Sequence, residues 1–170
     1  MPIAADKNLS LMWYLGYGSN MNRSIFEGRR GMRPLQALPA LLKNYQLRFN
    51  LAIGPGERGV ANLESEADAS TWGVLYLITT DQAEHLDRTE GVHRGTYQRL
   101  QVSVTLEGGE PIGAFTYQSN RISQGRKPSP RYMSLLIEGA IQHRLPRDYL
   151  DYLQNFGLAV DERLSDPQSS

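Results

Sequence analysis

The alternation of apolar and polar residues predicts a series of β-strands, of which the clearest spans residues 97–106. Its apolar positions fall on one face of an extended chain: Leu100, Val102, Val104 and Leu106. Polar residues occupy the positions between them, which is the period of a strand with one buried face. The sequence Glu-Gly-Gly-Glu at 107–110 predicts a hairpin loop, and residues 112–118 return as the partner strand.

Shorter apolar or β-branched runs predict further strands. We expect them at residues 11–15, 36–42, 45–53, 60–63 and 71–78. The second and third are predicted to join at Lys43-Asn44, and the polar residues 64–70 are predicted to connect the last two. With the hairpin, the pattern predicts about seven strands, mostly linked as hairpins.

Helical patterns with recognisable ends separate these strands. We expect helices near residues 22–30, 81–90, 130–145 and 146–156. Thr79, Thr80 and Asp81 are candidates for the N-cap of the second helix, and Asp81 and Glu84 have the spacing of a capping box. Gly91 stands where a glycine often ends a helix. Ser129 and Pro130 form an N-cap followed by a first-turn proline. Because strands and helices do not alternate regularly, the predicted class is α+β, with a curved or closed, antiparallel or mixed sheet flanked by helices.

The length of the chain predicts one domain. Its 170 residues suffice for one sizeable core, and we expect that domain to cover residues 11–157. The polar residues 1–10 and 158–170 are predicted to be flexible ends.

The charge balance narrows the classes of partner. Lys and Arg number 18 and Asp and Glu number 18, so the basic surface expected of a nucleic-acid-binding domain is missing. No apolar run is long enough for a transmembrane helix, and residues 1–10 lack the pattern of a signal peptide. We therefore expect a cytoplasmic protein with neither nucleic acid nor membrane as a partner. No apolar stripe fixes the oligomeric state, which leaves a homodimer open.

Residues that usually hold metals are scarce. The chain has no cysteine, which excludes disulfides, thiolate chemistry and cysteine-bound zinc. His85, His93 and His143 are scattered, without the spacing of metal ligands. We expect no metal and no cofactor; a site shared by His85 and His93 is the alternative.

A strand followed by a turn of small residues is the first candidate site. The apolar stretch 11–15 runs into Gly16-Tyr17-Gly18-Ser19-Asn20, and a helical pattern begins directly afterwards. The glycines permit positive φ and leave backbone N–H groups uncovered. Such a turn presents N–H donors to an anion or to a polarised carbonyl group. Its spacing matches neither the P-loop nor the dinucleotide fingerprint, and a tight turn without a ligand is the alternative.

Glu90 is the candidate for proton transfer. It lies at the C-terminal end of the predicted helix 81–90, where the negative pole of the helix dipole disfavours a carboxylate. A carboxyl group in such surroundings suits a general base that becomes a general acid near neutral pH. An ordinary exposed glutamate at a helix end is the alternative.

Two further features accompany the helix that starts after Ser129. Tyr132 is in its first turn and either reaches a ligand or packs against the sheet. Before this helix runs a basic loop with Arg121, Arg126 and Lys127, which is either a lid over the site or a solvated surface.

Four segments together resemble the γ-glutamylcyclotransferase family, including its AIG2-like domains. They are Tyr14–Met21, Trp72–Tyr76, Leu86–Val92 followed by Tyr97, and Pro128–Tyr132. They occur in the family's order within residues 11–156, and their combination is far more specific than the Tyr-Gly-Ser-Asn turn alone. The resemblance implies a mixed β-barrel flanked by helices and an enzyme that needs no metal or nucleotide.

The resemblance also implies a reaction. In this family the α-amine of a γ-glutamyl group attacks its own γ-carbonyl carbon, closes the five-membered ring of 5-oxoproline and expels an amine. Carried over to this chain, Glu90 would be the acid and base of that reaction. The residues implied to bind the small-molecule substrate are Tyr14, Leu15, Gly16, Tyr17, Gly18, Ser19, Asn20, Tyr97 and Tyr132.

The substrate stays open among γ-glutamyl amino acids, γ-glutamylamines and γ-glutamyl-protected biosynthetic intermediates. The unusually basic loop before Tyr132 departs from the family's pattern, so the leaving group cannot be carried over. Two other interpretations also stand. One is an enzyme that cleaves a γ-glutamyl amide on a larger substrate, and the other is a non-catalytic module that binds a glutamyl-like ligand.

Overall fold

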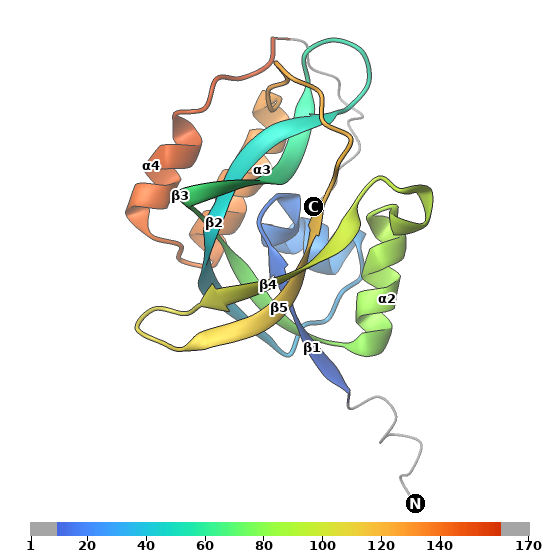
Figure 1. Cartoon of the computed structure of the whole chain (residues 1–170), viewed down its shortest axis with the longest axis vertical. Coiled ribbons are helices and arrows are strands. Elements are labelled where there is room, and N and C mark those ends of the chain that lie inside the picture. Colours follow the sequence, from blue (N-terminus) through green and yellow to red (C-terminus); the bar gives the residue numbers. More distant parts are fainter. Residues whose placement is uncertain (1–9, 161–170) are drawn as a thin grey trace, which may run out of the picture.

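The computed structural model describes residues 10–160, and in that part of the chain five strands close into a barrel with helices around it (Figure 1). The strands are β1 (Leu11–Gly16), β2 (Gln36–Ala52), β3 (Gly59–Thr79), β4 (Gln98–Thr105) and β5 (Pro111–Gln118). Their order around the barrel is β1-β3-β2-β4-β5. Neighbours run antiparallel except β1 and β5, which close the barrel in parallel where Tyr14 lies opposite Phe115. The predicted α+β class, with a mixed and largely antiparallel closed barrel, is confirmed.

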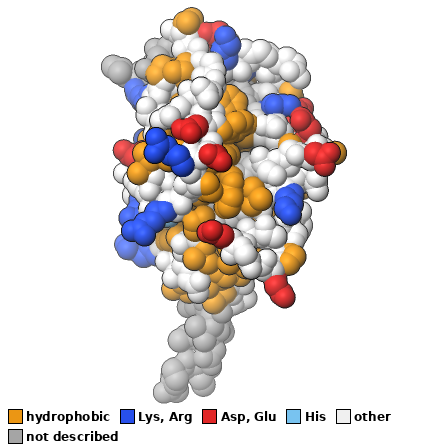
Figure 2. All heavy atoms as spheres, turned by 90° about the vertical axis from the view of Figure 1, so that its left-hand side faces the viewer, with side chains coloured by type: hydrophobic (Ala, Val, Ile, Leu, Met, Phe, Trp, Pro, Cys, Tyr) orange, Lys and Arg blue, Asp and Glu red, His pale blue; other side chains and the backbone are white. Residues whose placement is uncertain are grey.

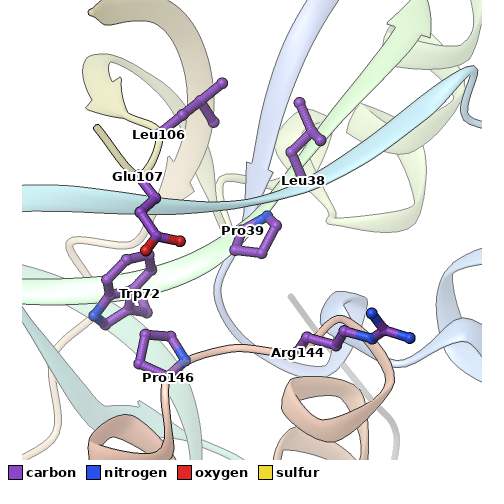
Figure 3. A pocket seen from close by; sticks show the side chains of 7 residues that line it. All are labelled: Leu38, Pro39, Trp72, Leu106, Glu107, Arg144 and Pro146. Carbon is purple, nitrogen blue, oxygen red and sulfur yellow. The ribbon is translucent and has the colours of Figure 1, made fainter. Parts of the chain in front are cut away.

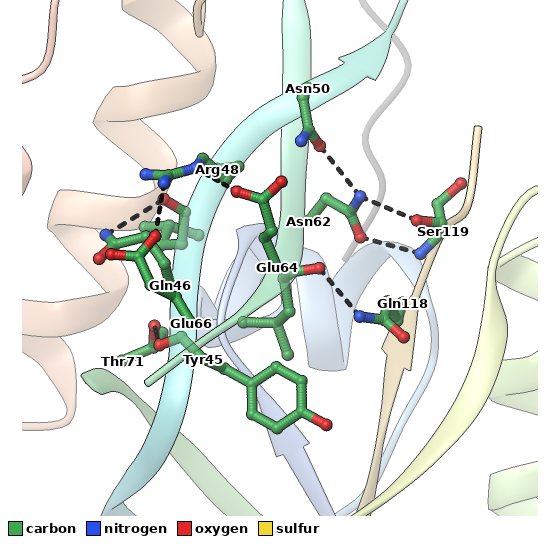
Figure 4. Close-up of polar contacts among 12 residues, drawn as sticks. Tyr45, Gln46, Arg48, Asn50, Asn62, Glu64, Glu66, Thr71, Gln118 and Ser119 are labelled. Atoms are coloured by element: carbon green, nitrogen blue, oxygen red, sulfur yellow. Dashed lines mark hydrogen bonds and ion pairs between the residues drawn. The ribbon is translucent and has the colours of Figure 1, made fainter. Parts of the chain in front are cut away.

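Strands β2 and β3 are each longer than the sequence pattern predicts. The predicted break at Asn44 is instead a bulge inside β2, where Asn44 has φ 70° and the pairing shifts register. The polar residues 64–70, predicted as a connection, belong to β3, where Glu64, Ser65 and Ser70 pair with β2 on either side of the same register shift. Arg48 of β2 donates to Glu64 and Glu66 of β3 at 2.9 and 2.8 Å (Figure 4), and such opposite charges across a ribbon stabilise a polar strand pair. The prediction of seven strands is therefore wrong, because four of them merge into two.

Helical segments surround the barrel. They are η2 (Ser19–Met21), η3 (Ser24–Arg29), α2 (Thr80–Thr89), η4 (Val92–Arg94), α3 (Pro130–Gln142) and α4 (Arg147–Gln154). The predicted helix at 22–30 is a turn of π-helix, η3, and the 3₁₀ turn η2 lies just before it. The other three predicted helices correspond to α2, α3 and α4.

Contacts at the helix ends test the predicted caps. Of the three predicted N-cap candidates, Thr79 caps α2: its hydroxyl accepts a first-turn backbone N–H at 3.1 Å. Asp81 lies within the helix, so the capping box suggested by its spacing to Glu84 is not the N-cap. Gly91 follows α2 with φ 70°, the left-handed conformation that glycine tolerates, as predicted. The Ser129 hydroxyl accepts the Tyr132 N–H at 3.1 Å, which confirms the predicted N-cap of α3.

Aromatic rings fill the barrel beside β1. Phe26 of η3 stacks on Tyr14 of β1 and on Tyr76 of β3, with ring centroids 5.8 and 4.0 Å away. Phe115 and Tyr117 of β5 pack against the same Tyr14 ring. All five side chains are buried. This packing fixes β1, and with it the turn that follows, against both neighbouring strands.

A glycine brings α3 against η2. A Cβ atom at Gly139 would lie 2.6 Å from the backbone carbon of Met21, so no larger residue fits without displacing η2 or α3. Beside this contact, Asn22 Nδ2 donates to the Leu135 carbonyl at 3.2 Å and to Glu138 Oε1 at 2.7 Å. The turn after β1 is thereby fastened to α3 as well as to the barrel.

Side chains, rather than strand pairing, join β3 to the end of β5. Asn62 Nδ2 donates to Asn50 Oδ1 at 2.9 Å and to the Ser119 carbonyl at 3.0 Å (Figure 4). Asn62 Oδ1 accepts the Ser119 N–H at 2.8 Å, and Gln118 Nε2 donates to the Leu63 carbonyl at 3.1 Å. Because Asn62 is fully buried, these bonds satisfy polar groups that have no access to water.

The predicted flexible ends fall mostly outside the described residues, since 1–9 and 161–170 are not among them. Near the C-terminal end, the Ala159 N–H donates to the Pro128 carbonyl at 2.9 Å. The domain at 11–157 stays a prediction. Within residues 10–160, no helix is long and apolar enough to cross a membrane.

Candidate active site

Glu90 ends helix α2 and is buried. Its backbone N–H donates to the Leu86 carbonyl at 3.0 Å, and the left-handed Gly91 reverses the chain directly after it. Only 1% of Glu90 is exposed, so the alternative of an ordinary exposed glutamate is excluded. An isolated buried carboxylate is strongly disfavoured. The groups around Glu90 therefore decide whether it is charged.

Asn20 connects Glu90 to the turn after β1. Its Nδ2 donates to Glu90 Oε2 at 3.0 Å and to the Tyr14 hydroxyl at 2.9 Å. The Tyr76 hydroxyl donates to the Asn20 carbonyl at 2.7 Å and so holds the main chain of the turn. Asn20 is fully buried. The structure thus brings together the two features that the sequence singled out, the small-residue turn and the helix-end carboxylate.

Arg30 is a third member of this cluster, and the sequence reasoning missed it. Its Nε lies 3.4 Å from Glu90 Oε2 and donates to Asn20 Oδ1 at 2.6 Å. The side chain is 6% exposed. In the sequence Arg30 is one of two arginines that end a predicted helix, where basic residues are ordinary. The only signal for it was indirect: a buried acid requires a nearby cation.

Tyr97 and Tyr132 meet at one residue of β3. The Tyr97 hydroxyl donates to the Ala61 carbonyl at 2.6 Å, and the Tyr132 hydroxyl accepts the Ala61 N–H at 3.1 Å. Both tyrosines are buried. The two tyrosines and Ala61 thus connect three parts of the chain that are distant in the sequence. In this structure both hydroxyls form hydrogen bonds with backbone atoms of Ala61.

The tyrosines nearest to Glu90 stay protonated over the range in which a carboxylate titrates. Burial raises the pKa of Tyr14, of Tyr117 and of Tyr132 far above the usual 10. The negative charge of Glu90 raises each of these pKa values further. These phenols are neutral hydrogen-bonding groups around Glu90, not competing acids.

The remaining predicted residues build the turn. The Tyr17 hydroxyl donates to the Tyr117 carbonyl at 2.6 Å, and the Leu15 carbonyl accepts from the Thr116 hydroxyl at 2.7 Å. Gly16, Gly18 and Ser19 are buried between these anchors. The predicted use of left-handed glycine is wrong here, because Gly18 has φ −114° and Gly16 is paired within β1. At Gly16 and Gly18 the small size of glycine, rather than a positive φ, is what suits the close packing of the turn.

The basic residues before α3 are engaged with neighbouring backbone. Arg126 Nη1 donates to the carbonyls of Gly54 and Arg58, each at 3.1 Å. Arg121 Nη2 donates to the Arg94 carbonyl at 2.6 Å, and Lys127 Nζ lies 3.9 Å from a Glu57 carboxylate oxygen. These contacts fasten the loop 119–129 to the loop 54–58 and to the end of η4. A role as a lid stays a prediction.

A cavity of about 500 Å³ lies elsewhere, on the face that carries α4 (Figures 2 and 3). Figure 2 shows hydrophobic side chains gathered along the middle of this face. The cavity is lined by Leu38, Pro39, Trp72, Leu106, Glu107, Arg144 and Pro146. None of the residues predicted to bind substrate lines it, and neither does Glu90. The candidate site is therefore identified by its convergent polar contacts and not by this cavity.

The arrangement provides the elements of proton transfer next to a bound anion or carbonyl group. It has a buried carboxylate, a counter-charge and an amide that joins them, and this amide belongs to the turn after β1. Among residues 10–160, no three His, Asp or Glu side chains gather as a metal-binding cluster.

Comparisons with known proteins point to one family. The AIG2-like family matches residues 70–153, which include Glu90, Tyr97 and Tyr132. The γ-glutamylcyclotransferase of Bos taurus is 27% identical over 140 residues, which cover 80% of this chain and 73% of that protein. The γ-glutamyl cyclotransferase gliK of Claviceps purpurea is 33% identical over 141 residues, covering 76% of this chain and 63% of that one. A solved γ-glutamyl cyclotransferase has the same fold, with a TM-score of 0.79, 23% identity, and coverage of 95% of this chain and 94% of that chain.

Proposed function

Since this chain belongs to the γ-glutamylcyclotransferase and AIG2-like family, and is an enzyme of that type acting on a small molecule, we propose that it converts a γ-glutamyl amine or γ-glutamyl amino acid into 5-oxoproline. The products are 5-oxoproline and the free amine. The relatives from Bos taurus and Claviceps purpurea carry names that describe this reaction. In this chain, Glu90 is the group that we assign to proton transfer.

One observation carries the proposal: Asn20 donates to Glu90 Oε2 at 3.0 Å. This contact joins a carboxyl group able to move a proton to a turn able to hold a carbonyl group. Both are buried, so charges in the site are screened little by water. The reaction needs these two elements in one place.

The proposed reaction begins with a proton transfer. The ionised Glu90 takes a proton from the α-ammonium group of the glutamyl moiety, which frees the nitrogen lone pair. That nitrogen attacks the γ-carbonyl carbon of the same molecule, so a new C–N bond forms and the carbonyl oxygen becomes an oxyanion. Because nucleophile and electrophile belong to one molecule, the protein needs only to fold the substrate into the reactive shape.

The second half of the reaction breaks the original amide bond. Backbone N–H groups of the turn 14–20 stabilise the oxyanion, as preorganised donors do in acyl transfer. Glu90 returns its proton to the nitrogen of the leaving amine and, once ionised, takes the second proton from the ring nitrogen, which is positively charged after its attack. The carbonyl group then reforms, the C–N bond to the leaving amine breaks, and Glu90 passes this second proton to the amine, which leaves as an ammonium ion. Protons and electrons balance, and Glu90 is again ionised. Tyr97 and Tyr132 are proposed to shape the pocket for the glutamyl group.

The test distinguishes cyclisation from hydrolysis. The purified protein is incubated with a panel of γ-glutamyl amino acids and γ-glutamylamines in ¹⁸O-labelled water, and the products are identified by mass spectrometry. We expect 5-oxoproline without solvent oxygen and an equal amount of free amine. Glutamate carrying solvent oxygen as the primary product would instead identify a hydrolase, with Glu90 activating a water molecule.

An N-acetylated substrate provides the matched control. Acetylation removes the basic lone pair of the α-nitrogen, so this compound should bind without being cyclised. Binding is checked separately by competition against the free-amine substrate. Turnover of the acetylated compound would contradict attack by the substrate's own amine.

We further propose that residues 11–157 form the complete unit for this reaction and that no cofactor takes part. Activity measured after exhaustive dialysis against a chelator tests the second point, and loss that zinc restores would reveal a metal site.

A further inference from the structure

We infer that Arg30 is a positioning residue that keeps Glu90 ionised and that it does so together with Asn20. This role presupposes the proposed function, because Glu90 is the group that Arg30 serves. The two residues lie sixty positions apart in the sequence, and only the fold brings them together.

The main chain of Arg30 is fixed from two sides. Its N–H donates to the Ile25 carbonyl at 2.9 Å, which closes the end of η3. Its carbonyl lies 2.8 Å from His85 Nε2, on the helix that Glu90 ends. Arg30 is therefore held in place relative to α2 by its backbone, independently of its side chain.

The side chain of Arg30 sets the orientation of Asn20. Arg30 Nε donates to Asn20 Oδ1 at 2.6 Å, so the oxygen end of that amide faces the cation. The nitrogen end must then face the opposite way, where it donates to Glu90 Oε2 at 3.0 Å and to the Tyr14 hydroxyl at 2.9 Å. Because Arg30 has donors only, the reverse orientation of the amide would place two donors against each other. By fixing the orientation of the Asn20 amide, Arg30 ensures that Asn20 donates a hydrogen bond to the Glu90 carboxylate.

The same cation acts on Glu90 directly. Arg30 Nε lies 3.4 Å from Glu90 Oε2, and both side chains are almost fully buried, at 6% and 0% exposure. Burial and the negative pole of α2 both favour a neutral carboxyl group. A guanidinium at this distance favours the charged form instead. Arg30 therefore favours the form of Glu90 that can accept a proton from the substrate.

The other groups facing Glu90 do not replace this cation. Tyr14 on β1, Tyr117 on β5 and Tyr132 on α3 have pKa values raised by burial and stay neutral. On α2 itself, Asp87 is engaged with Arg99 at 2.9 Å and with the Tyr117 hydroxyl at 2.6 Å. Of these neighbours, Arg30 is the one whose charge opposes that of Glu90 at close range.

The kinetic test compares pH profiles of kcat/KM for the wild type, Arg30→Met and Arg30→Lys. Loss of the cation should move the acid limb of the profile to higher pH by about 1–3 units, the usual effect of an arginine on a nearby carboxyl group. Arg30→Lys keeps the charge and should restore most of that shift. Arg48→Met is the matched control, since Arg48 pairs with Glu64 and Glu66 on the exposed ribbon and its loss should leave the profile in place.

A merely structural role gives a different result. In that case Arg30→Met would lower kcat/KM by the same factor at every pH, and the acid limb would not move. This outcome would overturn the inference. Should Arg30→Met fail to fold, Arg30→Gln keeps hydrogen-bond donors without the charge and is expected to show the same shift.

A spectroscopic titration separates this inference from the proposed function. The protein is labelled with [δ-¹³C]glutamate, the Glu90 resonance is identified by its absence in Glu90→Gln, and its titration is followed by NMR. The midpoint should rise by about 1–3 pH units in Arg30→Met. Such a rise without any cyclotransferase activity would support the role of Arg30 and reject the proposed function. An unchanged midpoint in an active enzyme would overturn the role of Arg30 alone.

Discussion

Asn20 and Glu90 lie 70 positions apart in the sequence and are joined by a 3.0 Å hydrogen bond in the interior of the protein. The carboxylate comes from the residue that caps the C-terminal end of one helix, and the amide comes from the turn after the first strand. Every property that we assign to the site depends on this hydrogen bond between Asn20 and Glu90. The predictions below test its chemistry, the packing that holds it, and the loop beside it.

Replacing Glu90 by glutamine should keep the fold and remove most of the activity. The two side chains are nearly isosteric, but the amide cannot exchange a proton near neutral pH. We expect kcat to fall by about 100-fold or more, the scale at which a general acid and base contributes. Glu84→Gln, an exposed position on the same helix, should retain normal turnover. Near-normal kcat in Glu90→Gln, measured by release of 5-oxoproline, would remove Glu90 from the mechanism.

Replacing Gly139 by alanine should destabilise the protein and disturb the turn after β1. The new Cβ would lie 2.6 Å from the Met21 backbone, so α3 and η2 must move apart. Forcing a methyl group into a packed interface costs about 1–3 kcal/mol, which denaturant unfolding would measure. Gly113→Ala is the control, because nothing lies within 4 Å of the Cβ atom there. Equal stability of the two variants would show that the α3–η2 contact is not tight.

Acidification should destabilise the protein through His143. Burial, together with the nearby positive Arg23, lowers the pKa of His143 from 6.5 to about 4. Between pH 6.5 and 4 the unfolded chain binds a proton at this position and the folded protein does not, so the free energy of unfolding falls as the pH falls through that range. The slope for one such proton is at most about 1.4 kcal/mol per pH unit.

Urea unfolding at several pH values checks this contribution. His143→Gln should lose less stability between pH 6.5 and 4 than the wild type does. His93→Gln, at an exposed position, should follow the wild type. Parallel curves for all three proteins would show that His143 titrates normally in the folded state.

Replacing Arg126 by methionine should reduce stability and leave the preference for leaving groups unchanged. Its guanidinium donates to the Gly54 and Arg58 carbonyls at 3.1 Å, and hydrogen bonds from charged groups contribute about 1.5–3 kcal/mol. Arg147→Met should change stability by less than about 1 kcal/mol, because its pair with Asp151 is exposed. A selective loss of kcat/KM for substrates with an acidic leaving group would instead support the lid.

Local sequence patterns correctly predicted those helices and strands that are marked by regular alternation or by a clear capping sequence. The strand at 97–106 alternates regularly, and α3 begins at Ser129 and Pro130, so both are found close to their predicted positions. The ribbon of β2 and β3 was divided because Asn44 and the polar residues 64–70 look like a turn and a loop in the sequence. Asn44 and Asp68 do have positive φ, but the residues around them pair with the partner strand, which lies beyond any local window, so both strands continue.

The candidate site likewise contains residues that the sequence identified and one residue that it did not. Glu90, the turn at 14–20 and Tyr132 were identified from the sequence because their order and spacing resemble one family. Arg30 was not, because its place beside Glu90 depends on the path of η3 and on a backbone contact with His85. The capping residue of α2 could not be chosen from the sequence either, since Thr79, Thr80 and Asp81 are all suitable caps by composition.

The parallel contact between Tyr14 and Phe115 has a consequence for the synthesis of this protein. Strand β1 pairs with β3 on one edge and with β5 on the other, and β5 ends at Gln118, 39 residues after the end of β3 at Thr79. At about 5–20 residues per second, the ribosome needs about 2–8 s to add those residues. During that interval the nascent chain presents an unpaired strand edge, which is a template for association with other chains. Association of stalled chains should therefore be greatest when translation stops after β3 has left the ribosome but before β5 has, and it should cease once β5 has left.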